Sequence, residues 1–328
     1  MKSRQTGIVM RTLYLCALVL SLSGPARAAE PDWPASISLA TAAPGGTYHA
    51  YGAELAKILR RELGISVAEQ LSEGPAENIQ LIQSGAVQLG FVTMGAALQG
   101  WNGSGAWTKG RQLRAIRALF PMYDTPFTFA VLKDSGIRTL ADMAGKRIGV
   151  GPRGGTAGDY LPKFLTVLNI DAQLVFASYE DLSAQLQAGK IDLLAAAAGA
   201  PFPALAALDA KKLVRFIGLG RNEILALRLA MPELTAATVP AGAYPSLLRD
   251  YATVGLFNFA VASADLPDSL VFDIVAAVFA HRDELIRAHP AAAETIPANF
   301  SRNTFLPYHR GANRYYSNSM ARDIVQGD

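Results

Sequence analysis

Residues 37–52, Ile-Ser-Leu-Ala-Thr-Ala-Ala-Pro-Gly-Gly-Thr-Tyr-His-Ala-Tyr-Gly, place a short apolar run just before a Gly-Gly pair. From Tyr48 onward, apolar residues recur at the spacing of one helix face as far as Leu63, and Gly64 then ends the pattern. The stretch predicts a strand, a tight turn and a helix in direct succession. Such a turn directs backbone N–H groups and a helix N-terminus at one point, which suits a small anion or carboxylate.

This order of elements continues along the chain and returns about a hundred residues later. The first unit continues with a strand at 65–67, a helix after Gly74-Pro75 that ends at Gly85, and a strand at 89–92. The second unit has strands at 147–150, 174–177 and 191–194, a glycine-rich loop at 151–158, and a helix at 181–188 that ends at Gly189. Strands that alternate with helices predict parallel sheets with the ligand beyond their carboxyl ends. Two such units predict an α/β fold of two similar lobes with a cleft between them, and a single large doubly wound domain is the alternative.

Two apolar runs, at 126–133 and 253–262, are placed to cross between the lobes. A helical region at 269–288 and a polar tail with Tyr308, Tyr315 and Tyr316 follow the second run. We therefore expect lobe boundaries at 29–133 with 251–328, and at 134–250. Two crossings make a hinge, and a hinge permits closure on a ligand.

The first 28 residues have the features of an export signal. Basic residues (Lys2, Arg4, Arg11) precede an apolar run at 13–22, and Ala26-Arg27-Ala28 follows as a small-x-small cleavage site. We expect cleavage near Ala28 and a periplasmic protein. An uncleaved membrane anchor is the alternative, although the apolar run is short for a bilayer span.

The charge balance gives no support for nucleic-acid binding. The full chain has 30 basic and 27 acidic residues, but residues 1–28 contain four of the basic ones and none of the acidic ones. The remaining 26 basic residues are thus matched by 27 acidic ones, so no positive field is expected. The single cysteine, Cys16, lies in the apolar run of the signal, so the mature chain is expected to have no disulfide and no cysteine metal site.

Candidate ligand-binding residues lie where the predicted turns and strands end at the cleft. These are Gly46, Thr47, Tyr48, Thr93, Met94, Arg153, Gly155, Thr156, Gly199 and Ala200. Thr47 and Tyr48 open the first helix, where free N–H groups collect; the alternative is an N-cap and a core tyrosine. Thr93 and Met94 end a strand, with core packing as the alternative. The small residues Gly199 and Ala200 are expected to let the backbone approach the ligand.

In the second lobe, Arg153 could hold a carboxylate through two parallel hydrogen bonds, and a solvated surface arginine is the equal alternative. Pro162 favours a helix that begins near Asp159, which would leave Thr156 in the loop with a free hydroxyl. Residues 149–154 fit G-x-G-x-x-G, but Pro152 has no N–H for a pyrophosphate and no acidic residue closes the next strand. A nucleotide is therefore not expected.

The sequence points to no cofactor and no catalytic group. The four histidines lack the spacing of a metal site, and neither G-x-S-x-G nor H-E-x-x-H occurs. We therefore expect a non-enzymatic protein.

Five segments in order resemble the TAXI-type solute-binding subunits of TRAP transporters. They are Thr41 to Gly52, Glu77-Asn78 with Gln83-Ser84-Gly85, Gly189-Lys190-Ile191-Asp192 with Gly199-Ala200-Pro201, Val239-Pro240-Ala241-Gly242-Ala243-Tyr244-Pro245, and His309-Arg310-Gly311-Ala312-Asn313-Arg314-Tyr315-Tyr316. The resemblance implies a type II periplasmic binding-protein fold, a small organic ligand such as a carboxylate or an amino acid, and delivery to a TRAP membrane permease. It also implies a monomer.

The chain departs from that family at the expected cleft. Glu73-Gly74-Pro75-Ala76 replaces a Gly-Ser pair, Thr93-Met94-Gly95 stands where an acidic residue is common, and Arg153 replaces an uncharged residue. Glu73 and Met94 would shift selectivity toward an amine-bearing or more apolar compound. Two other functions remain open: a ligand-binding component of a membrane sensor, and an exported enzyme on the same fold.

Overall fold

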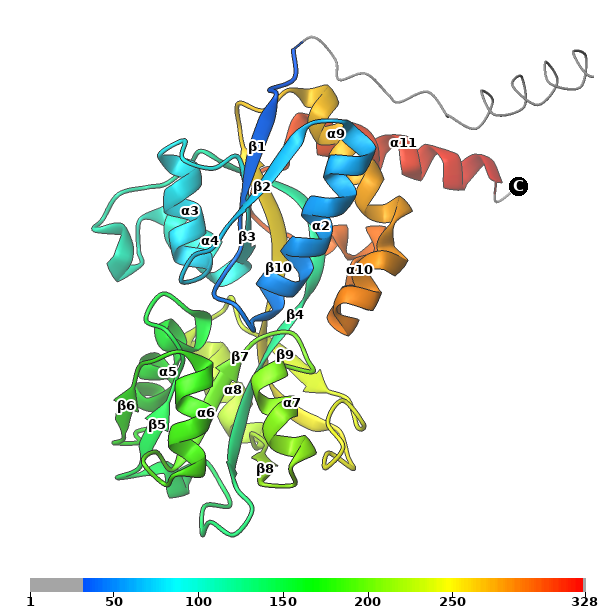
Figure 1. The fold of residues 1–328 in the computed structure, drawn as a ribbon. Helices are drawn as coiled ribbons and strands as arrows, with labels where there is room; N and C mark the ends of the chain where they lie inside the picture. Colours follow the sequence, from blue (N-terminus) through cyan, green and yellow to red (C-terminus); the bar gives the residue numbers. More distant parts are fainter. Residues whose placement is uncertain (1–31, 327–328) are drawn as a thin grey trace, which may run out of the picture.

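The computed structural model describes residues 32–326 (Figure 1). The predicted signal peptide, its cleavage site and Cys16 lie outside the described residues. No helix of residues 32–326 is long and apolar enough to cross a membrane.

The first βα unit forms as the sequence predicts. It consists of β1 (Ser36–Ala40), α2 (Thr47–Leu63), β2 (Ser66–Gln70), α3 (Pro75–Gln83) and β3 (Leu89–Thr93). The three strands lie in the order β2-β1-β3, with β1 parallel to both neighbours. Gly64 and Gly85 end their helices with φ of 66° and 78°, a left-handed conformation that costs glycine little.

The second unit repeats this arrangement with β5 (Arg147–Gly149), α5 (Thr156–Val167), β6 (Gln173–Val175), α6 (Tyr179–Gln187) and β7 (Leu193–Ala197). Its strands lie in the order β6-β5-β7, again parallel around β5. Each unit is bordered by one antiparallel strand, β10 (Tyr251–Ser263) beside β3 and β4 (Ile116–Leu132) beside β7.

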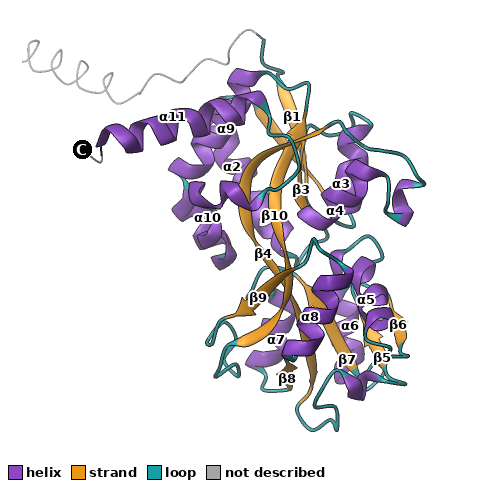
Figure 2. Ribbon diagram, turned by 180° about the vertical axis from the view of Figure 1, so that it is seen from behind, coloured by secondary structure: helices purple, strands orange, loops and turns teal. Residues whose placement is uncertain are grey.

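The strands β4 and β10 are the two crossings between the units, and they pair with each other in antiparallel register. They join the ten strands of the described chain into one sheet. Eight of these strands follow one another along a single path, and beside it β8 (Val214–Ile217) pairs with β4 and β9 (Thr235–Val239) pairs with β10. Figures 1 and 2 show both strands running from one half of the molecule into the other. The register of the pair shifts between Phe257 and Phe259 and again between Ala260 and Val261.

The buried apolar residues divide into separate cores. All members of one cluster lie between Phe127 and Leu256. The members of the other two clusters lie within residues 33–123 and 257–316. We call residues 127–256 lobe 2 and the rest of the described chain lobe 1. The boundaries at 133/134 and 250/251 remain predictions from the sequence.

The helices outside the repeated units cover the two lobes. In lobe 2 these are α7 (Pro203–Ala210) and α8 (Arg221–Ala230), and in lobe 1 they are α4 (Met94–Asn102), α9 (Asp268–Ala280), α10 (Arg282–Ala288) and α11 (Arg310–Gln326). The C-terminal segment thus returns to lobe 1, where α9 and α10 lie beside α2 (Figure 1).

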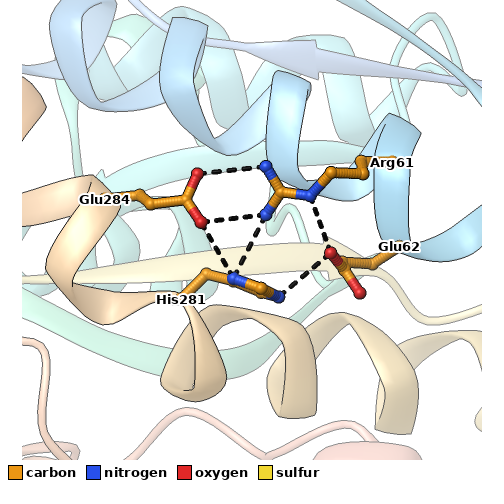
Figure 3. Close-up of polar contacts among 4 residues, drawn as sticks. All are labelled: Arg61, Glu62, His281 and Glu284. Carbon is orange, nitrogen blue, oxygen red and sulfur yellow. Dashed lines mark hydrogen bonds and ion pairs between the residues drawn. The ribbon is translucent and has the colours of Figure 1, made fainter.

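A network of ion pairs ties α10 to the end of α2 (Figure 3). Arg61 binds the Glu284 carboxylate through two bonds of 3.0 Å, and its Nε lies 2.8 Å from Glu62. His281 lies within 3.0 Å of both carboxylates. The hydrogen bonds from Arg61 lower the pKa of Glu62 and of Glu284.

The polar tail expected at the C-terminus is instead a packed helical segment. The hydroxyl of Tyr316, a buried residue of α11, donates to the Leu119 carbonyl oxygen at 3.1 Å. Tyr308 stacks on Phe300 with ring centroids 4.3 Å apart. Tyr316 is part of the core of lobe 1, and Tyr308 and Tyr315 pack against it. Their aromatic rings bury apolar area although the neighbouring residues in the sequence are polar.

Helix α5 begins at Thr156, not near Asp159 as the position of Pro162 predicts. Pro162 lies inside the helix and lacks the N–H that would bond to Gly158, at a cost of about 3 kcal/mol. Burial of Tyr160, Leu161 and Phe164 on the same helix outweighs this cost. Thr156 is therefore the first helical residue, in the position that Thr47 has in α2.

Candidate ligand-binding site

A cavity of about 390 Å³ lies between the lobes. Lobe 1 lines it with Ala42, Ala43, Pro44, Gly46, Thr47, Tyr48, Glu73, Gly74, Pro75, Tyr123 and Thr125. Lobe 2 contributes Pro152, Gly155, Thr156, Ser178, Tyr179, Glu180, Ala197, Ala198 and Phe202. Two larger hollows, of about 520 and 620 Å³, are each lined by lobe 2 alone around Leu132 and Ser135. The cavity between the lobes is the better candidate, because sites for small molecules favour domain interfaces with apolar walls and a few polar groups.

Two helix N-termini of the same construction face this cavity. In α2 the chain turns through Gly46, whose N–H donates to Ala43 at 3.2 Å, and in α5 it turns through Gly155, whose N–H donates to Pro152 at 3.1 Å. Both glycines are N-caps with extended backbone, and neither has a side chain that could accept from the helix. The first N–H groups of each helix are therefore available to a ligand, and the helix dipole makes these ends attractive to anions.

Asn258 of β10 fixes the floor of the cavity. Its Oδ1 accepts from the Tyr48 hydroxyl at 2.6 Å, and its Nδ2 donates to the Tyr123 carbonyl at 2.7 Å and to Thr125 Oγ1 at 2.6 Å. The hydroxyl of Tyr48 is thus already occupied, which leaves the ring as its contribution to the wall. Asn258 is fully buried, so each of these bonds is made without competition from water.

The hydroxyl of Tyr123 differs from that of Tyr48, because it forms no hydrogen bond with the described residues. It lines the cavity and is only 1% exposed, yet its hydroxyl has no hydrogen-bond partner among the described residues. Its ring lies 6.4 Å from that of Tyr48 and 5.9 Å from that of Tyr51. Burial, reinforced by these two tyrosines, raises the pKa of Tyr123 well above its ordinary value. The group is therefore a neutral, buried hydroxyl without a hydrogen-bond partner among the described residues.

The loop before α3 brings Glu73 and Gly74 to the cavity. Asn78 holds this loop, since its Nδ2 donates to Thr41 and Phe91 carbonyls at 2.8 Å and its Oδ1 accepts from Ser72 at 2.6 Å. The Ser72 hydroxyl in turn accepts from the Gly74 N–H at 3.1 Å.

The lobes touch each other around the cavity. A Cβ added to Gly74 would lie 2.9 Å from the Gly154 carbonyl oxygen, so these two glycines allow the backbones to meet. The Thr47 hydroxyl donates to the Gly199 carbonyl oxygen at 3.3 Å. On another side Gln99 of α4 donates to Asp159 of α5 at 2.8 Å. The described arrangement is therefore closed.

Five of the predicted residues line the cavity: Gly46, Thr47, Tyr48, Gly155 and Thr156. Thr93 and Met94 do not. The hydroxyl of Thr93 accepts from the Ala96 N–H at 3.2 Å and so caps α4, and Met94 is packed in a core of lobe 1.

Arg153, Gly199 and Ala200 are also absent from the lining. The exposed Arg153 guanidinium lies 4.1 Å from the centre of the Phe176 ring, and its neighbour Pro152 faces the cavity instead. Gly199 lies at the contact between the lobes, where an added Cβ would meet Thr47 and Tyr123 at 3.0 Å. Ala200 follows it, and Ala197 and Ala198 form that part of the wall.

Sequence reasoning missed the side chains at the floor and at the rim. Tyr123, Thr125 and Asn258 lie within apolar strands, and only the pairing of β4 with β10 brings them together. The position of Tyr179 and Glu180 at the start of α6 can be predicted from the sequence, because α6 repeats α3 and the loop before α3 is expected at the cleft.

The side chains that line the cavity carry a net negative charge. Glu73 and Glu180 are the charged residues among the lining side chains, and no lysine, arginine or histidine of the described chain lines the cavity. No group of three or more His, Cys, Asp or Glu side chains within residues 32–326 could hold a metal ion. The site thus combines two helix N-termini, aromatic and small apolar walls, and two carboxylates.

Comparison with known proteins agrees with this architecture. A periplasmic transporter aligns with a TM-score of 0.52 at 14% identity, over 91% of this chain and 98% of its own. The periplasmic binding protein BugD gives 0.52 at 12% identity over 86% and 95%, and an ancestral arginine-binding protein bound to arginine gives 0.50 at 13% over 78% and 97%. The predicted fold, α/β and of the periplasmic binding-protein type, is confirmed by these likenesses.

A family match extends over the same part of the molecule. The model of the NMT1-like family covers residues 39–319, from β1 to α11, and thus includes both lobes, both crossing strands and the lined cavity. The chain belongs to the NMT1-like family.

Proposed function

We propose that this protein is an exported, periplasmic solute-binding protein that captures a small organic carboxylate or amino acid between its lobes and delivers it to a membrane permease. It acts without a cofactor and without turnover, as a monomer. The observation that carries the proposal is the convergence of two uncapped helix N-termini in one cavity, with one from each lobe.

Binding would proceed by closure of the lobes about β4 and β10. In an open state each helix N-terminus would face water, whereas in the closed state both face the same enclosed volume. A ligand that contacts both lobes binds the closed state more strongly and shifts the population toward it. The two helix ends favour an anionic group, and the apolar walls favour a compact body.

The permease is proposed to be of the TRAP type, with this chain as a TAXI-type subunit. The support is the order of the five sequence segments described above. A sensor component with the same cleft is the alternative. A permease gene next to this one would favour transport, and a sensor kinase gene would favour sensing.

Thermal unfolding tests the proposal directly. The chain from residue 29 onward would be partly unfolded and refolded to remove any carried ligand, then melted with dicarboxylates, 2-oxoacids, amino acids and aromatic acids. A ligand at a hundred times its Kd adds about 2.7 kcal/mol. Each kcal/mol raises the Tm by roughly 2–4 °C for a domain of this size class. A saturable rise supports binding, and no rise with any compound contradicts it.

A further inference from the structure

We infer that His289 couples the closure of the lobes to pH, because the closed arrangement holds this imidazole neutral and a proton on it favours the open state. His289 lies in lobe 1 between α10 and the short 3-10 helix η3 (Pro290–Glu294), and it is not among the residues that line the cavity. The inference rests on the proposed opening and closure of the lobes and adds a condition that governs them.

His289 lies where lobe 1 meets lobe 2. It is 4% exposed, and the carbonyl group of Pro201, a residue of lobe 2, lies close enough to the ring to act on its charge. Two residues away in each segment, Ala291 faces Gly199, since a Cβ added to Gly199 would lie 2.9 Å from Ala291 Cβ. Lobe 2 therefore covers part of the ring, and separation of the lobes would admit water to it.

The hydrogen bonds of His289 define its protonation state. Its Nδ1 accepts from the Ala291 N–H at 3.2 Å, so Nδ1 carries no proton and the neutral ring has its hydrogen on Nε2. Nε2 is buried and has no hydrogen-bond partner among the described residues. A second proton would have to bind at Nδ1, where it would meet the Ala291 N–H. The ring would have to turn to keep that proton, and the closed arrangement leaves a charged imidazole away from water.

No charged side chain offsets a proton on His289. The ionisable residues of α10, of η3 and of the adjoining end of β4 are Arg282, Asp283, Glu284, Arg287, Glu294, Tyr123 and Asp124, while Tyr51 of α2 contacts Thr295, and Tyr179 and Tyr244 contact Phe202 in lobe 2. Burial lowers the pKa of His289, the Pro201 carbonyl raises it to a smaller extent, and none of these side chains acts on it. Glu284 is held by Arg61, and Glu294 accepts from the Asp124 N–H at 3.1 Å.

His309 shows the same local geometry away from the contact between the lobes. Its Nδ1 accepts from the Gly311 N–H at 3.2 Å, it is 2% exposed, and its Nε2 also lacks a hydrogen-bond partner within residues 32–326. The groups that act on its pKa, which are Asp268, Leu266, Ala264 and Arg310, all belong to lobe 1. A proton on His309 therefore bears on the stability of lobe 1 and not on the position of lobe 2.

Acid should open the lobes through His289. Above about pH 6.5, the ordinary pKa of histidine, the ring is neutral in both states, and the ratio of closed to open protein does not depend on it. Below that pH the open state binds a proton that the closed state excludes, because the pKa is lowered only where the ring is buried. The ratio then falls by at most about tenfold for each pH unit, until the pH reaches the pKa of the closed state.

Energy transfer between dyes on the two lobes tests the inference. Residues 29–328 contain no cysteine, so Gln112→Cys in lobe 1 and Lys190→Cys in lobe 2, both exposed, provide two sites for pH-insensitive dyes. Transfer is measured without ligand between pH 8 and pH 5 at constant ionic strength, with circular dichroism to verify that the protein stays folded. In this labelled parent the ratio of closed to open protein should fall by roughly threefold or more.

Two matched variants of the labelled parent assign the effect. In His289→Asn the amide Oδ1 can accept from the Ala291 N–H but does not titrate, so the transfer should not change with pH. His309→Asn makes the same replacement within lobe 1 and should keep the decline of the parent. Both variants retain Asp124 and Glu294, so titration of these carboxyls is common to all three proteins.

Three results would overturn the inference. They are transfer that does not change with pH in the parent, a decline in His289→Asn equal to that of the parent, and loss of the decline in His309→Asn alone. Each would leave the proposed function intact, because that is decided by the thermal unfolding with ligands.

Discussion

The side-chain amide of Gln99 donates to the carboxylate of Asp159 at 2.8 Å, and the two residues belong to different lobes. Gln99 lies on α4 and Asp159 in the first turn of α5, so this bond exists only while the lobes are together. The acceptor side of the Gln99 amide is also occupied, because its Oε1 accepts from Trp107 Nε1 at 3.0 Å. Gln99 thus couples a fixed contact within lobe 1 to a contact that opening would break.

Gln99→Glu should therefore weaken ligand binding without loss of the fold. The new carboxylate can still accept from Trp107, but it would face Asp159 as a like charge in place of a donor. The closed state loses one hydrogen bond, a net of about 0.5–1.5 kcal/mol, and gains repulsion, so the Kd should rise roughly tenfold. Calorimetry measures the Kd, and small-angle scattering should show a larger radius of gyration. Gln112→Glu, on an exposed part of lobe 1, is the control. An unchanged Kd would show that the contact does not contribute to closure.

Gly199→Ala should hold the lobes apart. The added Cβ would lie 2.9 Å from Ala291 Cβ and 3.0 Å from Thr47 Cγ2, both across the contact, while the backbone of Gly199 needs no left-handed φ. We expect a Tm within about 3 °C of wild type in the absence of ligand, and at least tenfold weaker binding. Gly136→Ala is the matched control, because nothing lies within 4 Å of its added Cβ. If Gly199→Ala binds as wild type does, the described contact is not required in the liganded state.

Gly46→Asp should abolish binding while the helix stays stable. The extended backbone of this N-cap, with φ −90° and ψ 159°, suits aspartate, whose carboxylate would accept from the open N–H groups of α2 and take the place of the ligand. Stability should stay equal or rise by roughly a few tenths of a kcal/mol. Gly46→Ala adds the same Cβ, 3.2 Å from the Ala43 carbonyl, but no acceptor, so it should keep most of the affinity. Equal Kd values for the two variants would exclude this helix end as the anion site.

The stability of the fold should decline below about pH 6.5. Burial lowers the pKa of His289 and of His309, so at low pH the unfolded chain binds protons that the native state does not. Above the unfolded pKa both states are neutral at these residues, and no effect is expected. Below it the free energy of unfolding falls until the pH reaches the native pKa. The measurement is the Tm between pH 8 and pH 5 in buffers of constant ionic strength.

His289→Gln/His309→Gln should flatten this decline, because glutamine keeps an acceptor and does not titrate. Burial raises the pKa of Asp124 and of Glu294, which favours the native state as the pH falls and so opposes the histidines. The comparison of wild type with the double variant cancels this opposing contribution, since both proteins retain the two carboxyls. A decline of the same slope in both proteins would assign it to other groups.

The βα units follow from local patterns, which explains why the sequence predicts them. Gly64, Gly85 and Gly189 all end helices in the left-handed region, a preference that glycine has in any context. The start of α5 depends instead on tertiary burial: Pro162 favours a later start, and the apolar face of Tyr160 and Phe164 overrides it.

The sequence predicts only those parts of the candidate site that local backbone turns form. The Gly-Gly-Thr turns place Thr47 and Thr156 at the cavity without help from distant residues. Tyr123 and Asn258 are set in apolar strands, and their polar groups meet only because β4 and β10 pair across more than a hundred residues of chain. The sequence does not show where the side chains of Arg153 and Thr93 lie: the Arg153 guanidinium lies over the Phe176 ring, and the Thr93 hydroxyl accepts from the Ala96 N–H.

The pairing of β3 with β10 also fixes the order in which the molecule can assemble. Lobe 2 draws its core from the uninterrupted stretch 127–256, so it has every partner it needs once that stretch has emerged. The first strands of the chain form their full set of contacts later, because the second neighbour of β3 is residues 258–262 of β10, and α2 packs against α9 and α10. Truncation after lobe 2 would consequently damage the N-terminal strands, at the opposite end of the polypeptide from the cut.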